Sequence, residues 1–82
     1  MGKKWYVYLL RCKDDTLYCG ITDDILRRIA AHNAGKGAKY TRGRGPVELV
    51  YQEELETYSD ALRREYAIKQ LTRQQKRKLI GE

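Results

Sequence analysis

The sequence lacks the motifs that define several large classes of enzyme. It has no Gly-rich phosphate-binding loop ending in Lys-Ser or Lys-Thr, and its single histidine rules out a metal site built on paired histidines. No serine lies beside that histidine, so a serine nucleophile with a neighbouring base is not indicated. P-loop nucleotide hydrolysis, histidine-based zinc catalysis and serine hydrolysis are therefore not predicted.

Long apolar segments are also absent. The run Trp5–Leu10 ends at Arg11 and is too short for a signal-peptide core or a membrane span. Cys12 and Cys19 both lie in apolar, strand-like sequence, where reduced and buried thiols are expected rather than a disulfide. These absences predict a cytoplasmic protein that does not enter a membrane.

Phenylalanine is missing, whereas tyrosine occurs seven times among the 82 residues. Buried tyrosines need hydrogen-bond partners, and exposed tyrosines can stack on nucleobases. A chain of this length buries only about 60% of its unfolded surface, so it has room for one compact core. We therefore expect a single domain over residues 1–82 whose aromatic residues also form a working surface.

Acidic residues are missing from one long segment, which concentrates the net charge of +6. The basic residues of that segment are Arg27, Arg28, Lys36, Lys39, Arg42 and Arg44. Residues 48–60 are acidic without a base, and residues 63–78 are basic with Glu65 as the only acid. This alternation predicts a polyanion-binding side and an opposing side, although charges that only maintain solubility would give a similar pattern.

Two segments near the N-terminus predict a β-hairpin. Lys4–Cys12 and Thr16–Thr22 are rich in β-branched and aromatic residues, and they flank the turn sequence Lys13-Asp14-Asp15. A three-residue loop places the odd positions of both strands together. The buried face then carries Val7, Leu9, Leu17, Cys19 and Ile21. The opposite face carries Tyr6, Tyr8, Tyr18 and Gly20.

A first helix is expected after the hairpin, with Thr22 or Asp23 as its N-cap and Gly35 at its end. Its apolar stripe consists of Ile25, Leu26, Ile29 and Ala30. Arg28 and His32 are one turn apart at the margin of this stripe. They are therefore expected to point along the sheet toward the tyrosine face.

The remaining segments complete the predicted fold. Residues 35–46 are rich in glycine and basic residues and predict a flexible loop, followed by a third strand at 47–55. A second helix is expected from Ser59 or Asp60 to about Leu71, and Thr72 can cap a last helix that ends at Ile80. The fold class is α/β (α+β), with the order ββαβαα and a three-stranded antiparallel sheet flanked by helices.

An ordered set of polar residues runs through these elements. Tyr6-Val7-Tyr8 and Tyr18-Cys19-Gly20 lie on adjacent strands, and an arginine, a histidine and a glutamate follow on later helices. From residue 6 to residue 80 this order resembles the GIY-YIG nuclease domain in its small, stand-alone bacterial form. The resemblance implies an endonuclease whose matching catalytic positions here are Tyr8, Tyr18, Arg28, His32 and Glu65.

Phosphodiester cleavage gives each of these positions a chemical role. The resemblance makes Tyr18 the candidate general base, which needs activation because an ordinary tyrosine has a pKa of about 10, and Tyr8 would position water or phosphate. Arg28 offers a planar fork that pairs bidentately with phosphate. His32 would relay a proton or hold Tyr18, and Glu65 would bind one Mg²⁺ or Mn²⁺ ion.

Two departures from the family pattern keep other functions open. Tyr6 stands where the family name has glycine, and Ile21 follows Gly20 where several active relatives carry a lysine. Gly20 itself would let the strand end pass close to the site. A nucleic-acid-binding module without turnover is therefore the alternative function, and an adaptor that uses the acidic residues 48–60 for protein interaction is a third.

The expected partner is nucleic acid, DNA rather than RNA, and not a membrane. The candidate contacts in the basic loop are Lys36, Lys39, Tyr40, Arg42 and Arg44. Basic residues at 73–78 either add to this surface or serve only helix capping and solubility. A domain of this size contacts few base pairs, so structure-directed rather than sequence-directed recognition is expected, with a dimer or a protein partner as further options. Repair, recombination and RNA processing all stay open as pathways.

Overall fold

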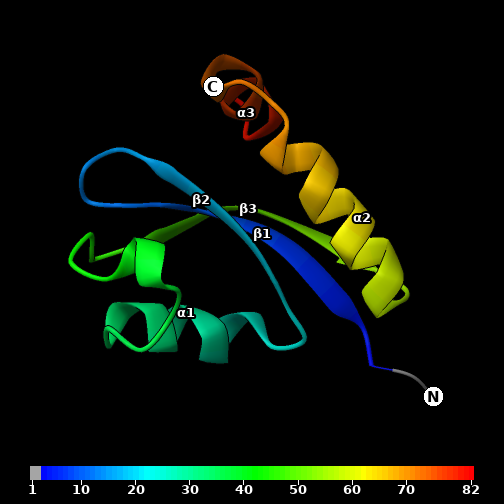
Figure 1. Cartoon of the computed structure of the whole chain (residues 1–82), viewed down its shortest axis with the longest axis horizontal. Coiled ribbons are helices and arrows are strands. Elements are labelled where there is room, and N and C mark those ends of the chain that lie inside the picture. Colours follow the sequence, from blue (N-terminus) through cyan, green and yellow to red (C-terminus); the bar gives the residue numbers. More distant parts are fainter. Residues whose placement is uncertain (1–2) are drawn as a thin grey trace.

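A computed structural model describes residues 3–82 and shows a three-stranded antiparallel sheet with helices on both faces. The elements in chain order are β1 (Trp5–Arg11), β2 (Leu17–Thr22), α1 (Ile25–Asn33), the 3₁₀ helix η1 (Lys39–Thr41), β3 (Glu48–Leu55), α2 (Tyr58–Lys69) and α3 (Arg73–Leu79). The strand order is β2-β1-β3, so β2 and β3 are the edges. The predicted order ββαβαα is confirmed, with α1 below the sheet and α2 and α3 above it (Figure 1).

The hairpin register follows the prediction. Tyr8 lies opposite Gly20, Leu9 lies opposite Cys19, and the N–H of Cys12 donates to the carbonyl of Thr16 at 2.9 Å. The connecting loop is therefore three residues long, and Asp15 at its end has a φ of +67°, a conformation that aspartate tolerates better than most residues. Even-numbered residues of both strands consequently share one face.

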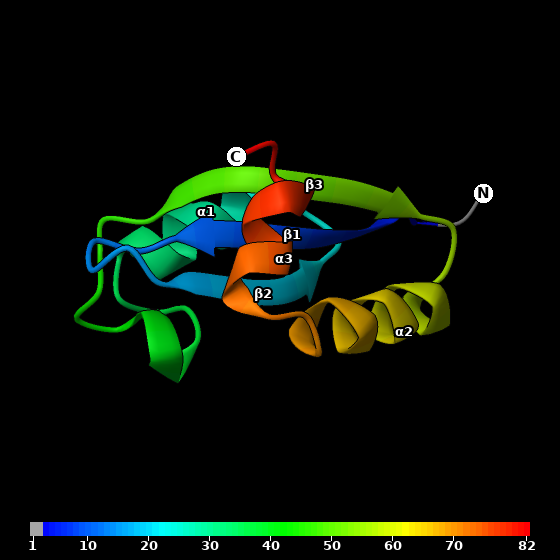
Figure 2. The ribbon, with the colours of Figure 1, turned by 90° about the horizontal axis from the view of Figure 1, so that it is seen from above.

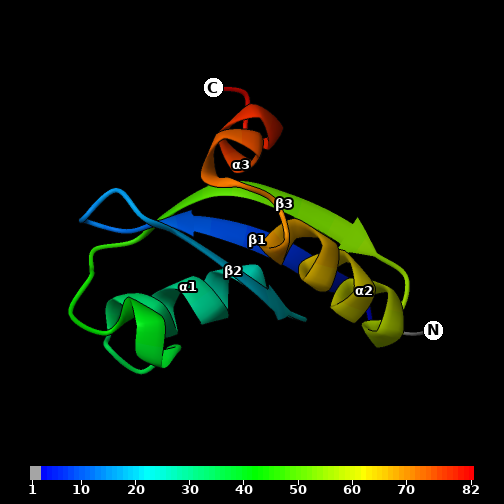
Figure 3. The same cartoon turned by 45° about the horizontal axis from the view of Figure 1, so that its top comes forward.

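Both faces of the sheet are buried, one by α1 and the other by α2 and α3 (Figure 3). On the odd-numbered face, a core cluster joins α2 to the hairpin and consists of Val7, Leu9, Cys19, Ala61 and Ile68. On the even-numbered face, α1 covers a second cluster that consists of Tyr8, Leu10, Cys12 and Val47. The two cysteines are free and buried, as expected, and belong to opposite faces.

Three details of the helices differ from the sequence prediction. The N-cap of α1 is Asp24 rather than Thr22 or Asp23, because the Thr22 hydroxyl accepts the Asp24 N–H at 3.1 Å and turns the chain first. The N-cap of α2 is Thr57 rather than Ser59 or Asp60. Leu26 is 82% exposed, so the sheet-facing stripe of α1 is narrower than predicted. Thr72 caps α3 as predicted, in a reciprocal capping box with Gln75.

The segment between α1 and β3 is more ordered than the sequence indicates. It contains η1, and its end is fixed by Asn33, whose side-chain oxygen accepts the Val47 N–H at 2.7 Å and whose amide donates to the Val47 carbonyl at 3.5 Å. The prediction of a loop without any regular element is therefore wrong at residues 39–41. Among residues 3–82, no helix combines the length and apolar character that a membrane crossing requires.

Candidate active site at the edge strand

A chain of buried hydrogen bonds links the sheet to α1 and η1. The hydroxyl of Tyr8 lies 3.0 Å from His32 Nε2, and His32 Nδ1 lies 2.7 Å from the hydroxyl of Thr41. The Thr41 hydroxyl in turn donates to the carbonyl of Ala38 at 2.9 Å. His32 is only 1% exposed, so it lies within the buried stripe of α1 and not at its margin as predicted, although it does point toward the tyrosine face.

The donors and acceptors in this series of hydrogen bonds can be assigned. The single proton of the Thr41 hydroxyl is used on Ala38, so Thr41 must accept from His32 Nδ1–H. Burial, with a smaller contribution from the nearby Arg28 guanidinium, lowers the pKa of His32, so the ring is neutral near neutral pH. Its Nε2 is then an acceptor, and Tyr8 donates to it. His32 therefore holds Tyr8 by a hydrogen bond, and it contacts Tyr18 only by packing, at 5.4 Å between ring centres.

Two glycines leave the space that these rings occupy. A Cβ atom on Gly20 would lie 2.6 Å from the Tyr8 hydroxyl oxygen and 3.0 Å from a ring carbon of Tyr18. A Cβ atom on Gly37 would lie 2.3 Å from His32 Nδ1. The lack of a side chain at Gly20 therefore makes room for the Tyr8 ring, and it is not needed for a turn at the strand end. The lack of a side chain at Gly37 lets the loop after α1 pass directly over His32.

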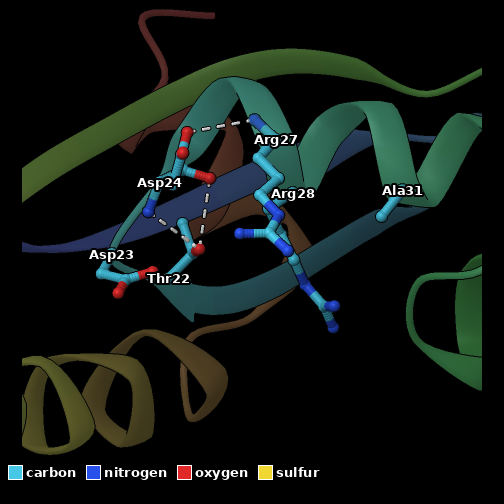
Figure 4. A pocket seen from close by; sticks show the side chains of 6 residues that line it. All are labelled: Thr22, Asp23, Asp24, Arg27, Arg28 and Ala31. Carbon is cyan, nitrogen blue, oxygen red and sulfur yellow. Dashed lines mark hydrogen bonds between the residues drawn. The ribbon is translucent and has the colours of Figure 1, made fainter.

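Arg28 faces both phenols from α1. It lines a hollow of about 300 Å³ at the start of the helix, and Figure 4 shows Arg27 and Arg28 extending from α1 toward β2. Burial raises the pKa of Tyr8, and Arg28 opposes that rise. Because no acidic side chain forms an ion pair with Arg28 within residues 3–82, its positive charge stays available to an anionic ligand.

Glu65 approaches the same edge from the opposite face of the sheet. Its carboxylate lies 3.3 Å from Lys69 Nζ, one turn further along α2, and its side chain is 19% exposed. Burial raises the pKa of Tyr18; Lys69 and Arg28 oppose this rise, and Glu65 adds to it. The pKa of Tyr18 thus depends on a charge on α1 below the sheet, Arg28, and on two charges on α2 above it, Glu65 and Lys69. Figure 2 shows α2 running alongside the β2 edge.

The predicted nucleic-acid contacts divide into two groups. Lys36, Lys39 and Arg42 are exposed and form no ion pair within residues 3–82. Arg44 instead fastens the loop, because its guanidinium pairs with Asp14 at 3.0 Å and lies 4.4 Å from the centre of the Tyr40 ring. Tyr40 stacks on Tyr18, with ring centres 5.8 Å apart, and is still 40% exposed.

Three residues of this region were not assigned to the site from the sequence. Thr41 carries no signal that links it to His32, because the contact depends on the path of the loop. Gly37 is one of several glycines in that loop, and only its contact with His32 distinguishes it. Lys69 does carry a signal, since it lies four residues after Glu65 on a predicted helix, but that spacing is equally typical of a surface ion pair.

A divalent cation fits the donor set at Glu65. Mg²⁺ is commonly held by one or two carboxylates and completes its coordination with waters and substrate phosphate oxygens. Glu65 is a partly exposed carboxylate whose ion-pair partner, Lys69, is a flexible surface lysine. No group of three or more His, Cys, Asp or Glu suited to a metal occurs in residues 3–82, so a cation here would depend on one carboxylate and on its substrate.

Comparison with known protein families identifies the family of this chain. The model of the GIY-YIG catalytic domain matches residues 4–78. The chain belongs to the GIY-YIG family. The match covers the tyrosine segments on β1 and β2 and the arginine on α1, and the roles of these residues stay predictions.

Small proteins related to this chain span nearly its whole length. The UPF0213 protein SH2523 of Staphylococcus haemolyticus is 60% identical over 79 residues, which are 96% of each chain. The UPF0213 protein NP_0776A of Natronomonas pharaonis is 51% identical over 82 residues, 100% of this chain and 96% of its own. The GIY-YIG domain therefore also forms most of the length of these relatives.

Solved structures support the same fold. The solution NMR structure of the UPF0213 protein BH0048 from Bacillus halodurans is 49% identical and superimposes with a TM-score of 0.61, covering 94% of this chain and 82% of that one. The solution NMR structure of EF2693 from E. faecalis is 43% identical, with a TM-score of 0.66 and coverage of 96% and 84%.

Proposed function

We propose that the protein is a metal-dependent endonuclease that hydrolyses phosphodiester bonds in DNA and selects its substrate by structure rather than by sequence. One observation carries the proposal: Tyr18 lies on the edge strand β2, packed against His32 of α1 and stacked on Tyr40 of η1. Burial raises the pKa of Tyr18, Lys69 and Arg28 oppose this rise, and Glu65 adds to it. A nucleic-acid chain can approach β2 directly, because an edge β-strand is accessible even where the protein has no enclosed cleft. The basic loop after α1 lies beside this edge and suits a polyanion.

Each residue has a defined task in this proposal. Arg28 binds the non-bridging oxygens of the phosphate and stabilises the charge that grows on them in the transition state. Tyr18 takes the proton of the attacking water, and the positive charges of Lys69 and Arg28 favour its ionised form. Tyr8 is not assigned as the base, because its hydroxyl is hydrogen-bonded to His32 and burial raises its pKa. Arg28 opposes that rise, and we assign Tyr8 to positioning the phosphate beside Arg28.

Glu65 is the proposed ligand for the metal, in keeping with a family whose domains typically use a divalent cation. Mg²⁺ or Mn²⁺ bound there would neutralise phosphate charge and assist the departure of the leaving oxygen. To bind a cation, the Glu65 carboxylate would have to give up its ion pair with Lys69. Lys69 lowers the pKa of Tyr18 against the effect of burial, so its positive charge favours loss of the phenolic proton.

The test is cleavage of a panel of branched, flapped and single-stranded DNAs, with matching RNAs, in Mg²⁺ or Mn²⁺. We expect product only with metal, and we expect Arg28→Gln and Glu65→Gln to lower kcat by about 10²-fold or more, the usual effect of removing one group that stabilises developing charge. Arg63→Gln and Glu54→Gln are matched controls, because both positions are exposed and lie outside the site. They should cleave like the wild type.

A nucleic-acid-binding module without turnover is the second candidate. It is favoured by the raised pKa values of Tyr8 and Tyr18, which keep both phenols protonated in the free protein near neutral pH. Metal-dependent product formation separates the two functions, whereas salt dependence of binding does not, since both would bind more weakly as salt rises. If every substrate in the panel stays intact while binding is retained, the module replaces the nuclease.

A further inference from the structure

A second hollow adjoins the site at the hairpin end of β2. Its volume is about 160 Å³, and it is lined by Thr16, Leu17, Tyr40, Arg73 and Lys76. Leu17 directly precedes Tyr18 in β2, and Tyr40 stacks on Tyr18. Figure 2 shows η1 and α3 close to this end of the strand. The hollow is therefore the next recess along the edge from the candidate catalytic tyrosine.

The charge around this hollow is positive and is held in position. Arg73 donates to the backbone carbonyl of Asp15 at 2.6 Å and to its carboxylate at 2.9 Å, and Arg77 pairs with the same carboxylate at 3.2 Å. Arg11 also approaches that carboxylate, at 3.4 Å. One aspartate thus orders several guanidinium groups without neutralising all of them. Lys76, which lines the hollow directly, forms no ion pair within residues 3–82.

The lining defines the chemistry of a ligand. Lys76 and Arg73 provide cations that suit a phosphate, whereas the Thr16 hydroxyl already donates its proton to Asp14 at 2.6 Å. Leu17 and the ring of Tyr40 offer apolar surface to the sugar or base attached to that phosphate. A free carboxylate would use the cations but not the apolar surface, so a nucleotide fits the lining better than an acidic side chain.

We propose that this hollow binds a backbone phosphate of the nucleic-acid strand on the hairpin side of the phosphate that Arg28 holds, with Lys76 as its main ligand. The inference rests on the proposed function for its partner but adds a binding site and a direction: the strand runs from the site toward the hairpin loop, between η1 and α3. Lys76 is then a substrate-binding residue, whereas Lys78 on the same helix is only a surface charge.

The experiment measures binding of a short fluorescein-labelled single strand of DNA to the full chain in EDTA, where metal-dependent cleavage cannot occur. Lys76→Gln should weaken binding about fivefold near 0.1 M salt and reduce the slope of log K against log[salt] by about 0.7, the counterion-release value for one phosphate on a single strand. Lys78→Gln removes the same charge from an exposed position on the same helix and should change neither quantity comparably.

The possible outcomes separate this site from the proposed function. Equal effects of Lys76→Gln and Lys78→Gln, or no effect of either, overturn the phosphate site even if the wild type cleaves DNA. A selective effect of Lys76→Gln upholds the site even if no substrate is cleaved. Polyglutamate serves as the competitor: if it displaces the DNA as well as unlabelled DNA of equal charge does, the hollow recognises negative charge alone, and the assignment to a nucleotide is wrong.

Discussion

Gly20 shows how closely the residues of the site are fitted to one another. The Tyr8 ring is buried against the position where a Cβ atom of residue 20 would lie, 2.6 Å from the hydroxyl oxygen and 2.7 Å from the ring carbon that bears it. Tyr8 cannot move away freely, because His32 holds its hydroxyl. We therefore predict that Gly20→Ala lowers the free energy of unfolding by about 1–3 kcal/mol, the usual cost of overpacking a core.

Chemical denaturation measures this loss, and Gly45→Ala is the matched control. A Cβ atom at Gly45 meets nothing within 4 Å, so its substitution should change the unfolding free energy by no more than about 0.5 kcal/mol. The ¹⁵N NMR signal of His32 Nε2 should also change in Gly20→Ala as the hydrogen bond from Tyr8 weakens. A Gly20→Ala protein as stable as the control, with an unchanged His32 signal, contradicts this view of the site.

The sequence was informative at this scale for residue types and much less so for contacts. Period-two alternation placed Tyr8 and Gly20 on one face, because a strand allows only two directions for a side chain. Nothing in that alternation shows that Tyr8 would bond His32, or that Thr41 would complete the chain. Those contacts depend on how a glycine-rich loop folds back over α1, which is decided by tertiary packing.

At the scale of the elements, α2 presents Glu65 and Lys69 one turn apart at the β2 edge, and their ion pair is only partly exposed. Lys69 has two effects: it occupies the carboxylate proposed to bind metal, and it lowers the pKa of Tyr18 against the effect of burial. We predict that Lys69→Gln raises both the pKa of Tyr18 and the affinity for Mn²⁺, because one positive charge leaves both neighbours.

Two measurements check the effects of Lys69. The Cζ chemical shift of ¹³C-labelled tyrosine, followed against pH and assigned with Tyr18→Phe, reports the pKa of Tyr18. Electron paramagnetic resonance of free Mn²⁺ reports the affinity for metal without any cleavage. Lys78→Gln is the control, since it removes the same charge from an exposed site on α3. If both quantities are unchanged in Lys69→Gln, Lys69 is an ordinary surface lysine.

The boundaries of the elements explain which parts of the fold were accessible from sequence. The cap of α3 was predicted because threonine is a good N-cap residue and Thr72 directly precedes the expected helix. The structure adds the reciprocal bond with Gln75, three residues further on. The cap of α1 was not predicted, because Thr22, Asp23 and Asp24 are all good capping residues. Asp24 becomes the N-cap because a turn leads from the end of β2 to α1 before the helix starts. The Thr22 side chain stabilises this turn by hydrogen bonds to the Asp24 backbone.

At the scale of the whole molecule, the sheet is enclosed between helices, and the proposed site lies at its β2 edge. The helices cover both faces, and the acidic strand β3 lies at the edge opposite β2. The alternating charge of the sequence predicts two sides of different sign, which stays a prediction. It could not show that β3, with its glutamates, and β2 are the two edges of one sheet. That arrangement depends on β1 lying in the centre, which follows from the long-range pairing of β1 with β3.

His32 links the stability of the whole fold to pH, since its neutral ring joins the sheet, α1 and η1. Its folded pKa is lowered, by burial first and by Arg28 second, whereas an unfolded histidine titrates near 6.5. As pH falls through about 6.5, His32 therefore becomes protonated in the unfolded state while it is still neutral in the folded state. We predict that wild-type protein loses unfolding free energy from about pH 7 to about pH 5, in proportion to this depression.

Denaturation curves recorded across this range for His32→Gln and Thr41→Val isolate the cause. His32→Gln is less stable at neutral pH but has no ring to titrate, so its stability should change less between about pH 7 and pH 5 than that of the wild type. Thr41→Val also loses a buried hydrogen bond, at a cost of about 1–2 kcal/mol, yet it keeps the histidine and therefore the pH dependence. Because Asp14 and Asp23 have lowered pKa values, they titrate below this window in all three proteins. Parallel curves for wild type and His32→Gln would show that His32 is not the group that links folding to acid.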